Sequence, residues 1–276
     1  LFRQPGLDGV KKSLDYFNRA IALDPNFALA WVEVGRVNSY FAGNSIVNPK
    51  EPLARAKAAL QRALELDETS ADAHLELARI KQSEWNWTEA ENEYRRAIEL
   101  NANLADAHYK YSTYLSILAR HDEALAEIKR AQDLDPLRVG LRRQEAFALS
   151  LARRYDEAVE KAEHAMSLEP PSQGTTYFGL ALIYASSGRY QQAIDSYRKA
   201  ISIMGETTSL QCYLGYALAM SGKRKEAQSI LHKLKTTKEY VSPTELAALH
   251  VGLGDKEAAF ASLEKAFAEH DLQLGF

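Results

Sequence analysis

The sequence predicts an all-α solenoid built from helix-turn-helix repeats. Apolar and small residues recur at helical spacing in both halves of Ala71 to Leu104, and a turn around Ser83 to Trp87 separates the halves. A similar pattern recurs along the rest of the chain. Two amphipathic helices of roughly a dozen residues each cannot enclose a core alone, so each unit needs neighbouring copies.

The repeat has a period of 34 residues. The second half of each copy typically carries a small residue, a large apolar residue four positions later and a small residue three positions after that. This triplet falls at Ser13/Phe17/Ala20, Ala56/Leu60/Ala63, Ala90/Tyr94/Ala97, Ala124/Ile128/Ala131, Ala158/Ala162/Ala165, Ala193/Tyr197/Ala200, Ala227/Leu231/Leu234 and Ala259/Leu263/Ala266. The first members are separated by 43, 34, 34, 34, 35, 34 and 32 residues.

A helix-turn-helix period of this length, with small residues at the helix contacts and Pro or Asp after the second helix, resembles the tetratricopeptide repeat. The resemblance covers nearly the whole chain and implies a right-handed α-α superhelix. We expect one solenoid over residues 1–276 with about seven and a half repeats. The expected divisions are a partial repeat 1–27, repeats 28–70, 71–104, 105–138, 139–173, 174–207, 208–239 and 240–271, and a C-terminal tail 272–276.

The first two copies depart from the regular pattern. Leu7 to Ala22 supplies only the second helix of the first copy, and Pro25 ends it because proline lacks the N–H that a continuing helix would use. In the second copy, Tyr40 to Pro52 contains the nine residues by which that step exceeds 34. Asn44, Asn48, Pro49 and Pro52 predict a loop there. Both a tolerated surface insertion and a functional loop stay open for this segment.

The later copies follow the pattern more closely. The fifth is the weakest, because Arg142 and Glu145 stand where large apolar residues are usual. In the sixth, Gly188 suits the left-handed backbone that often ends a helix. The last copy opens with Ser242-Pro243-Thr244-Glu245, a capping box with proline at the first helical position. We expect the tail from Leu272 to Phe276 to cover the end of the stack.

The overall composition excludes several classes of protein. The net charge is −3 with Lys and Arg spread among Asp and Glu, so we expect no direct binding of nucleic acid, which favours a basic face. No apolar run approaches the roughly 18 residues that cross a bilayer, so we expect no membrane insertion. Because the chain begins at Leu1 within a truncated copy, we expect a segment of a longer protein. We expect it in the cytoplasm, with the periplasm open if a membrane segment lies upstream.

Four stretches are similar to repeat arrays found in large bacterial regulators. In those proteins the array follows a winged-helix, kinase or cyclase domain, which implies a C-terminal sensing or interaction module here. The stretches are Ala22 to Trp31, Glu84 to Leu100, Ala119 to Pro136 and Tyr240 to Phe267.

Few residues suggest catalysis or metal binding. His74 and His108 are 34 residues apart and could face each other, but no Cys or carboxylate at a suitable spacing completes a ligand set, so we expect packing roles. Cys212 lacks an evident base and is expected to behave as a small apolar residue. We therefore predict no catalytic residue, no metal and no cofactor. In the turn between the two helices of the third copy, we expect Trp87 in the core and Trp85 partly exposed.

The predicted functional feature is a surface. The resemblance implies that the first helices line a concave groove in which peptides bind. Its charged part comes from repeats two and three and contains Glu33, Arg36, Asp72, Glu76, Arg79 and Gln82. Farther along it becomes aromatic and apolar. The residues predicted to contact a partner are Arg79, Tyr109, Lys110, Ile117, Arg143, Phe147, Phe178, Leu182, Tyr213 and Tyr216.

We therefore expect a protein-protein interaction or sensing module that is not an enzyme and that binds a protein or peptide ligand. Aromatic residues and arginine are the usual anchors of such surfaces. The opposing interpretation is that neighbouring first helices bury the apolar strip against each other. Two other functions stay open: a dimerising regulatory arm of a kinase or DNA-binding regulator, which would form a homodimer, and a cell-envelope assembly scaffold.

Overall fold

The computed structural model describes residues 7–43, 50–168, 173–269, 271 and 274. Within these residues the chain forms fifteen α-helices and no strand, so the predicted all-α class is confirmed. The chain divides into two compact units, Leu1–Tyr111 (unit 1) and Ser112–Phe276 (unit 2), and the boundary lies within one helix. Each unit is described by itself.

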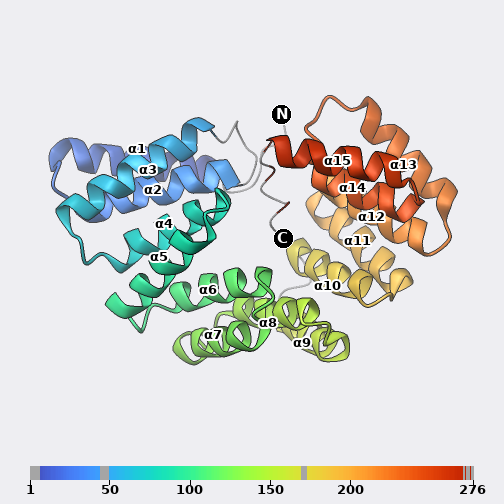
Figure 1. Ribbon diagram of the computed structural model, residues 1–276, viewed down its shortest axis with the longest axis horizontal. Coiled ribbons are helices and arrows are strands. Elements are labelled where there is room, and N and C mark those ends of the chain that lie inside the picture. Colours follow the sequence, from blue (N-terminus) through green and yellow to red (C-terminus); the bar gives the residue numbers. More distant parts are fainter. Residues whose placement is uncertain (1–6, 44–49, 169–172, 270, 272–273, 275–276) are drawn as a thin grey trace. The chain divides into compact units, whose positions relative to one another are not determined.

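Unit 1 consists of a single helix, two helix pairs and the start of a further helix. Its helices are α1 (Leu7–Leu23), α2 (Ala28–Gly43), α3 (Lys50–Leu66), α4 (Ala71–Ser83), α5 (Trp87–Leu100) and the first part of α6 (Ala105–Ile117). In Figure 1, α2 lies beside α3 and α4 lies beside α5, and these pairs are in contact.

Unit 2 continues the same arrangement from the second part of α6. Its helices are α7 (His121–Leu134), α8 (Val139–Leu151), α9 (Tyr155–Ser167), α10 (Gly174–Ser186), α11 (Tyr190–Met204), α12 (Thr208–Met220), α13 (Arg224–Thr236), α14 (Pro243–Leu253) and α15 (Lys256–Glu269). Each helix of the pairs α8/α9, α10/α11, α12/α13 and α14/α15 contacts its partner. The helices α10, α12 and α14 also contact one another in sequence, which places successive first helices side by side (Figure 1).

The spacing of the first helices reflects the sequence period. The helices α4, α6, α8, α10 and α12 begin at Ala71, Ala105, Val139, Gly174 and Thr208, each 34 or 35 residues after the one before. The small residue that opens the sequence triplet is buried in every copy after the first. These residues are Ala56, Ala90, Ala124, Ala158, Ala193, Ala227 and Ala259.

A left-handed residue closes the first helix in six consecutive copies. The residues and their φ angles are Trp85 (60°), Ala119 (58°), Arg153 (59°), Gly188 (77°), Gly222 (87°) and Gly254 (73°). In each copy the next backbone N–H donates to a carbonyl five residues earlier, for example Arg120 N to Leu115 O at 2.9 Å. This is the hydrogen bond of a Schellman motif. The prediction for Gly188 is confirmed, and the same geometry is imposed on three residues that carry side chains.

Three expectations need correction or lie outside the described residues. The segment Tyr40 to Pro52 is not a loop throughout, because α2 runs to Gly43 and α3 begins at Lys50. Pro52 is tolerated in the first turn of α3, where its missing N–H has no helical partner to lose. Trp87 is only partly buried, because it stands at the first position of α5 beside the turn. Residues 44–49, and most of the predicted covering tail after Asp271, are not described.

The left-handed position generates a stability prediction. Replacing Ala119, which is exposed, with glycine removes the clash between Cβ and the backbone at positive φ. We expect Ala119→Gly to raise the free energy of unfolding by about 1 kcal/mol in chemical denaturation. The matched control is Ala126→Gly, an exposed position inside α7, which should lower it by about 0.5–1 kcal/mol. Equal effects of the two variants would contradict the assignment of strain to Ala119.

Candidate binding surfaces

We use the term first-helix face for the side of the first helices that carries the residues predicted to bind a partner. In unit 1 these are Arg79, Tyr109 and Lys110. In unit 2 they are Ile117, Arg143, Phe147, Phe178, Leu182, Tyr213 and Tyr216. The two faces differ in chemistry, so each is built up separately from its side chains.

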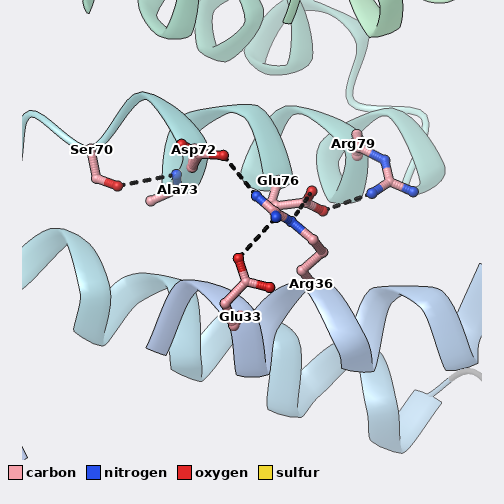
Figure 2. A network of polar contacts seen from close by, with 7 residues as sticks. All are labelled: Glu33, Arg36, Ser70, Asp72, Ala73, Glu76 and Arg79. Carbon is pink, nitrogen blue, oxygen red and sulfur yellow. Dashed lines mark hydrogen bonds and ion pairs between the residues drawn. The ribbon is translucent and has the colours of Figure 1, made fainter. Parts of the chain in front are cut away.

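In unit 1 the first-helix face is a network of ion pairs between α2 and α4 (Figure 2). Arg36 of α2 donates from Nη2 to Asp72 Oδ1 at 2.7 Å and from Nε to Glu76 Oε1 at 3.2 Å, both on α4. It also donates from Nη1 to Glu33 Oε1 at 2.8 Å, one turn earlier on its own helix. Arg79 Nη1 donates to the second Glu76 oxygen at 2.8 Å. Glu76 therefore holds one guanidinium on each carboxylate oxygen.

Local structure fixes this geometry. Ser70 accepts a hydrogen bond from the Ala73 amide at 3.4 Å and so caps α4 at its first turn. Glu76 and Arg79 lie three residues apart and therefore on the same side of α4. The Glu76 side chain is only 4% exposed, so its charge requires the two arginines.

The pKa shifts reflect the crowding of charge in this network. Burial raises the pKa of Glu33, against the opposing pull of Arg36, and the neighbouring Asp72 and Glu76 raise it further. For Arg36, burial acts to lower the pKa, but the carboxylates Glu33, Glu76 and Asp72 together outweigh it and the pKa is raised. The guanidinium is therefore held in its charged form by carboxylates of both helices.

The other predicted residues of unit 1 also contact each other. The Lys110 ammonium lies 4.3 Å from the centroid of the Tyr109 ring, a cation–π contact on α6. The Tyr94 ring of α5 lies 5.6 Å from the Tyr111 ring of α6, measured between ring centroids. The Tyr94 hydroxyl donates to Gln82 Oε1 at 2.8 Å. The charged and aromatic groups of this unit are thus extensively paired within the chain.

In unit 2 the first-helix face contains an aromatic cluster from three helices. Phe178 of α10 lies 5.7 Å from Tyr213 of α12 and 6.1 Å from Tyr197 of α11, measured between ring centroids. The rings of Tyr197 and Tyr213 are stacked, with 6.4 Å between centroids and 12° between planes. Tyr197 is fully buried, whereas Phe178 and Tyr213 are partly exposed. The aromatic cluster is therefore partly buried between neighbouring helices and partly exposed to solvent.

Tyr216 extends this surface along α12. Its ring meets Tyr190 of α11 edge-on at 6.3 Å. The helix α14 also approaches Tyr216 closely, because a Cβ on Gly252 would lie 3.0 Å from the Tyr216 ring and 3.2 Å from the Tyr216 carbonyl oxygen. Burial, followed by the neighbouring Tyr190, raises the pKa of the Tyr216 hydroxyl, which therefore stays protonated at neutral pH.

The remaining predicted residues of unit 2 are all partly exposed. Arg143 of α8 donates from Nη1 to the Thr176 hydroxyl of α10 at 3.0 Å, so it links two first helices. Leu182, like Phe178, packs against the buried core of unit 2. Phe147 and Ile117 lie on α8 and α6.

Sequence reasoning did not single out a buried carboxylate at the start of α14. Ser242 accepts from the Glu245 amide at 3.3 Å, which is half of the predicted capping box. The Glu245 side chain instead accepts a hydrogen bond from the Ser209 hydroxyl of α12. Asp271 accepts from the Ser242 hydroxyl at 2.6 Å and from the Thr244 amide at 3.3 Å, and so supplies the rest of the cap. Glu245 is 5% exposed, and burial, followed by the charge of Asp271, raises its pKa against the Ser209 hydrogen bond.

The histidines and the cysteine have structural contacts. His74 Nδ1 lies 2.5 Å from Glu93 Oε2, and its Nε2 lies 3.2 Å from the Glu68 carbonyl. The Nε2 of His108 lies 3.1 Å from the Ala102 carbonyl, which is the equivalent contact one copy later. Cys212 is fully buried, and burial, followed by the Glu245 carboxylate, raises the pKa of its thiol to about 12. A thiol in this state is a poor nucleophile at neutral pH.

Comparisons with known proteins agree with this arrangement of helices. Residues 141–206 match a family model described as tetratricopeptide repeat. Solved structures of repeat proteins superpose over most of the chain. The fold is that of a tetratricopeptide-repeat array. A comparison with curated proteins gave no match.

Three solved structures illustrate the range of proteins with the tetratricopeptide fold. PilF of Pseudomonas aeruginosa has 23% identity and a TM-score of 0.55, covering 82% of this chain and 92% of that one. PilW, a type IV pilus biogenesis factor, has 17% identity and a TM-score of 0.61, covering 80% of this chain and 98% of the PilW chain. The human IFIT1 dimer with PPP-AAAA has 16% identity and a TM-score of 0.69, covering 95% of this chain and 69% of the IFIT1 chain. At these identities the likeness shows the fold alone.

The ion-pair network of the tetratricopeptide array gives a prediction about stability. Arg36→Met removes one guanidinium from the buried Glu76 carboxylate, and we expect it to lower the free energy of unfolding by about 1–3 kcal/mol. Arg55→Met is the matched control, because Arg55 forms an exposed pair with Glu51, and pairs of that kind contribute about 0.5 kcal/mol or less. Denaturant unfolding of both variants measures the difference. Similar losses would show that the network adds nothing beyond an ordinary surface pair.

The buried Glu245 of the array gives a prediction about pH. Because its pKa is higher in the folded chain than in the unfolded chain, the folded state binds the proton more tightly. Glu245 therefore contributes more to stability as the pH falls through its pKa in the folded chain. The contribution is complete below its pKa in the unfolded chain. We expect wild type to gain stability relative to Glu245→Gln between pH 7 and pH 4, measured by denaturant unfolding at each pH. A pH-independent difference between the two proteins would contradict this.

Proposed function

We propose that this tetratricopeptide array is a non-enzymatic interaction module that binds a protein or peptide segment on the first-helix face of unit 2. The observation that carries the proposal is the partly exposed aromatic cluster of Phe178 and Tyr213 over the buried Tyr197. Aromatic side chains offer large contact areas at a low cost in conformational entropy.

The neighbouring residues favour the same interpretation. The partly exposed Phe147 and Leu182 extend the apolar surface along α8 and α10, and Met220 at the end of α12 is 41% exposed. Exposed apolar groups that share one surface of a protein usually mark a binding site. In unit 1, by contrast, Arg36, Asp72, Glu76 and Arg79 already pair with one another, so a ligand would have to replace existing ion pairs.

We further propose that the array is part of a larger bacterial signalling or transcription regulator. The support is the likeness of four stretches of sequence, among them Glu84 to Leu100 and Tyr240 to Phe267, to arrays attached to winged-helix, kinase or cyclase domains. Among the described residues no helix is both long and apolar enough to span a bilayer. A genomic reading of the sequence upstream of Leu1 would test this proposal by showing which domain precedes the array.

Selection from a displayed library of random peptides tests the binding surface. We expect wild type to enrich peptides, and the double variant Phe147→Ala with Phe178→Ala to bind them at least about tenfold more weakly, the loss typical of an anchor residue. The control is Tyr155→Ala on α9, which removes a partly buried aromatic residue from a second helix. Circular dichroism checks that helicity is retained. Unchanged binding by the folded double variant would show that this surface does not bind the selected peptides.

A second candidate function, homodimerisation, is favoured by α15. Phe260 and Phe267 are 67% and 64% exposed and lie seven residues apart, which places them on one face of this helix. Val251 of α14 is also exposed. Burial of a Phe side chain contributes about 1.5–3 kcal/mol, so two on each copy could support a weak dimer.

Light scattering over a dilution series tests the dimer. We expect the average mass of wild type to fall on dilution and Phe260→Ser to remain monomeric at every concentration. The matched control is Ala261→Ser, an exposed neighbour that does not remove an aromatic side chain. A wild type that is monomeric throughout would exclude the α15 face as a homodimer contact.

A further inference from the structure

The helix α15 repeats a side-chain pattern that α9 uses to bind the helix after it. The pattern has the order acid, apolar, acid, apolar, and its steps of three, four and three residues place the side chains along one side of a helix. It is formed by Asp156, Val159, Glu163 and Met166 on α9, and by Glu257, Phe260, Glu264 and Phe267 on α15. The two sets are equivalent, because each begins two residues before the first small residue of its copy, Ala158 or Ala259.

On α9 the two acids contact the copy that follows. The Asp156 carboxylate accepts a hydrogen bond at 2.5 Å from the Arg189 guanidinium, and Arg189 stands directly after the turn that ends α10. The Glu163 carboxylate accepts a hydrogen bond at 2.5 Å from the Tyr184 hydroxyl of α10. A helix that packs on this pattern therefore presents a hydroxyl to the second acid and is followed by a basic residue that reaches the first.

The two apolar positions of the pattern are buried or packed where another copy follows. On α9, which contacts α10, Val159 is 5% exposed and Met166 packs against the buried core of unit 2. On α11, which contacts α12, the equivalent Ile194 is fully buried and Ile201 packs against the same core. These positions therefore belong to the contact between successive copies.

On α15 the same apolar positions are exposed, by 67% for Phe260 and 64% for Phe267. Val251 of α14 is also 57% exposed. The residues that likewise stand three positions before the left-handed residue in the four preceding copies are buried: Ser116, Ser150, Ala185 and Ala219. A Cβ on Gly252 of α14 would lie 3.2 Å from the Ala219 Cβ, so the following first helix covers that position directly. The helices α14 and α15 thus expose the apolar side chains that an additional first helix would cover.

The two acids of the pattern on α15 are exposed as well. Among the described residues Glu257 and Glu264 form no ion pair, whereas Asp156 of α9 is paired with Arg189. Carboxylates beside an apolar strip favour a binding partner that carries positive charge beside its own apolar strip. The charges of α15 therefore select the same kind of helix as its apolar residues do.

A simpler interpretation is that these side chains are exposed only because no described helix follows α15. The outer face at the end of a repeat array is expected to be polar, because exposed apolar side chains lower solubility. This array does use polar residues at the same positions elsewhere, since the α13 counterparts of Phe260 and Phe267 are the exposed Gln228 and Lys235. Two phenylalanines in their place favour a surface that another helix covers.

We propose that α14 and α15 bind one amphipathic helix of a partner protein, in the position that α10 has on α9. The end face consists of Val251, Glu257, Phe260, Glu264 and Phe267. The partner helix packs its apolar side on the two phenylalanines, and a lysine or arginine at its C-terminal end pairs with Glu257. The end face shares no residue with the first-helix face, so it is a second binding surface on the same chain.

A second copy of this chain does not present such a helix. The first helices α10, α12 and α14 use the corresponding side to pack on the copy before them, as Gly252 of α14 does on Ala219. Docking one of them on another chain would require its own unit to open. A homodimer through Phe260 would cover the end face in a different way and is the alternative that the experiment distinguishes.

The probe is a synthetic peptide of residues 174–189, which contains α10 and Arg189, with a fluorophore joined to its N-terminus. Fluorescence anisotropy measures its binding to the whole chain. We expect saturable binding to wild type and at least about tenfold weaker binding to Phe260→Ser, the loss typical of an anchor residue. The matched control Ala261→Ser, which changes an exposed neighbour on α15, should bind like wild type.

Reversal of charge tests the pairing with Glu257. We expect Glu257→Lys to weaken binding of the peptide roughly fivefold, because it replaces an attraction by a repulsion. A second peptide with Arg189→Glu should show the opposite preference and bind Glu257→Lys more tightly than wild type. Glu269→Lys is the control, because it changes the net charge equally on another side of α15.

Two results would overturn the proposal. The first is no saturable binding to wild type, or binding that Phe260→Ser and Glu257→Lys leave unchanged although circular dichroism shows them folded. The second is a wild-type dimer in light scattering that Phe260→Ser dissociates and the peptide does not, which would assign the end face to a second copy. The double variant Phe147→Ala with Phe178→Ala should bind the peptide like wild type, so the end face and the first-helix face are tested independently.

Discussion

The close contact of helices through small side chains is the constraint on which the array depends. Alanines such as Ala90, Ala124 and Ala193 are fully buried at the same place in successive copies. A larger side chain there would separate the helices, because protein interiors are packed too tightly to absorb extra methylene groups. Each helix pair contacts mainly its sequence neighbours, so this contact is made again in every copy.

Because packing is confined to one set of positions, the first-helix face is free to vary. In unit 1 it carries Arg36 and Arg79 around Glu76, and the charges satisfy one another between α2 and α4. In unit 2 it carries Phe178 and Tyr213, whose rings pack between helices but keep part of their surface exposed. The same backbone therefore carries charged side chains that pair with one another in one unit and partly exposed aromatic side chains in the other.

A buried carboxylate makes this contrast sharper. Burial of an ionised group is costly unless it is paired and hydrogen-bonded. Glu76 meets that requirement with two guanidinium groups of its own chain, whereas Glu245 has the Ser209 hydroxyl and the start of α14. Comparison of copies within one chain identifies this difference, because the geometry around the two residues is otherwise set by the same helix-turn-helix repeat.

The sequence by itself determined the all-α class, the period and the positions of the small contact residues, because these follow from local helical spacing and recur in every copy. It also indicated that Gly188 would be left-handed, as glycine accepts that backbone freely. It did not reveal that Trp85, Ala119 and Arg153 adopt the same backbone, since the tertiary packing of each helix pair imposes the turn whatever residue occupies it. Nor did it predict that Arg36 would join Asp72 and Glu76, or that Ser209 would reach Glu245. Those contacts join residues 36 to 40 positions apart, so the partners of the charged side chains were decided only when the tertiary structure brought neighbouring first helices together.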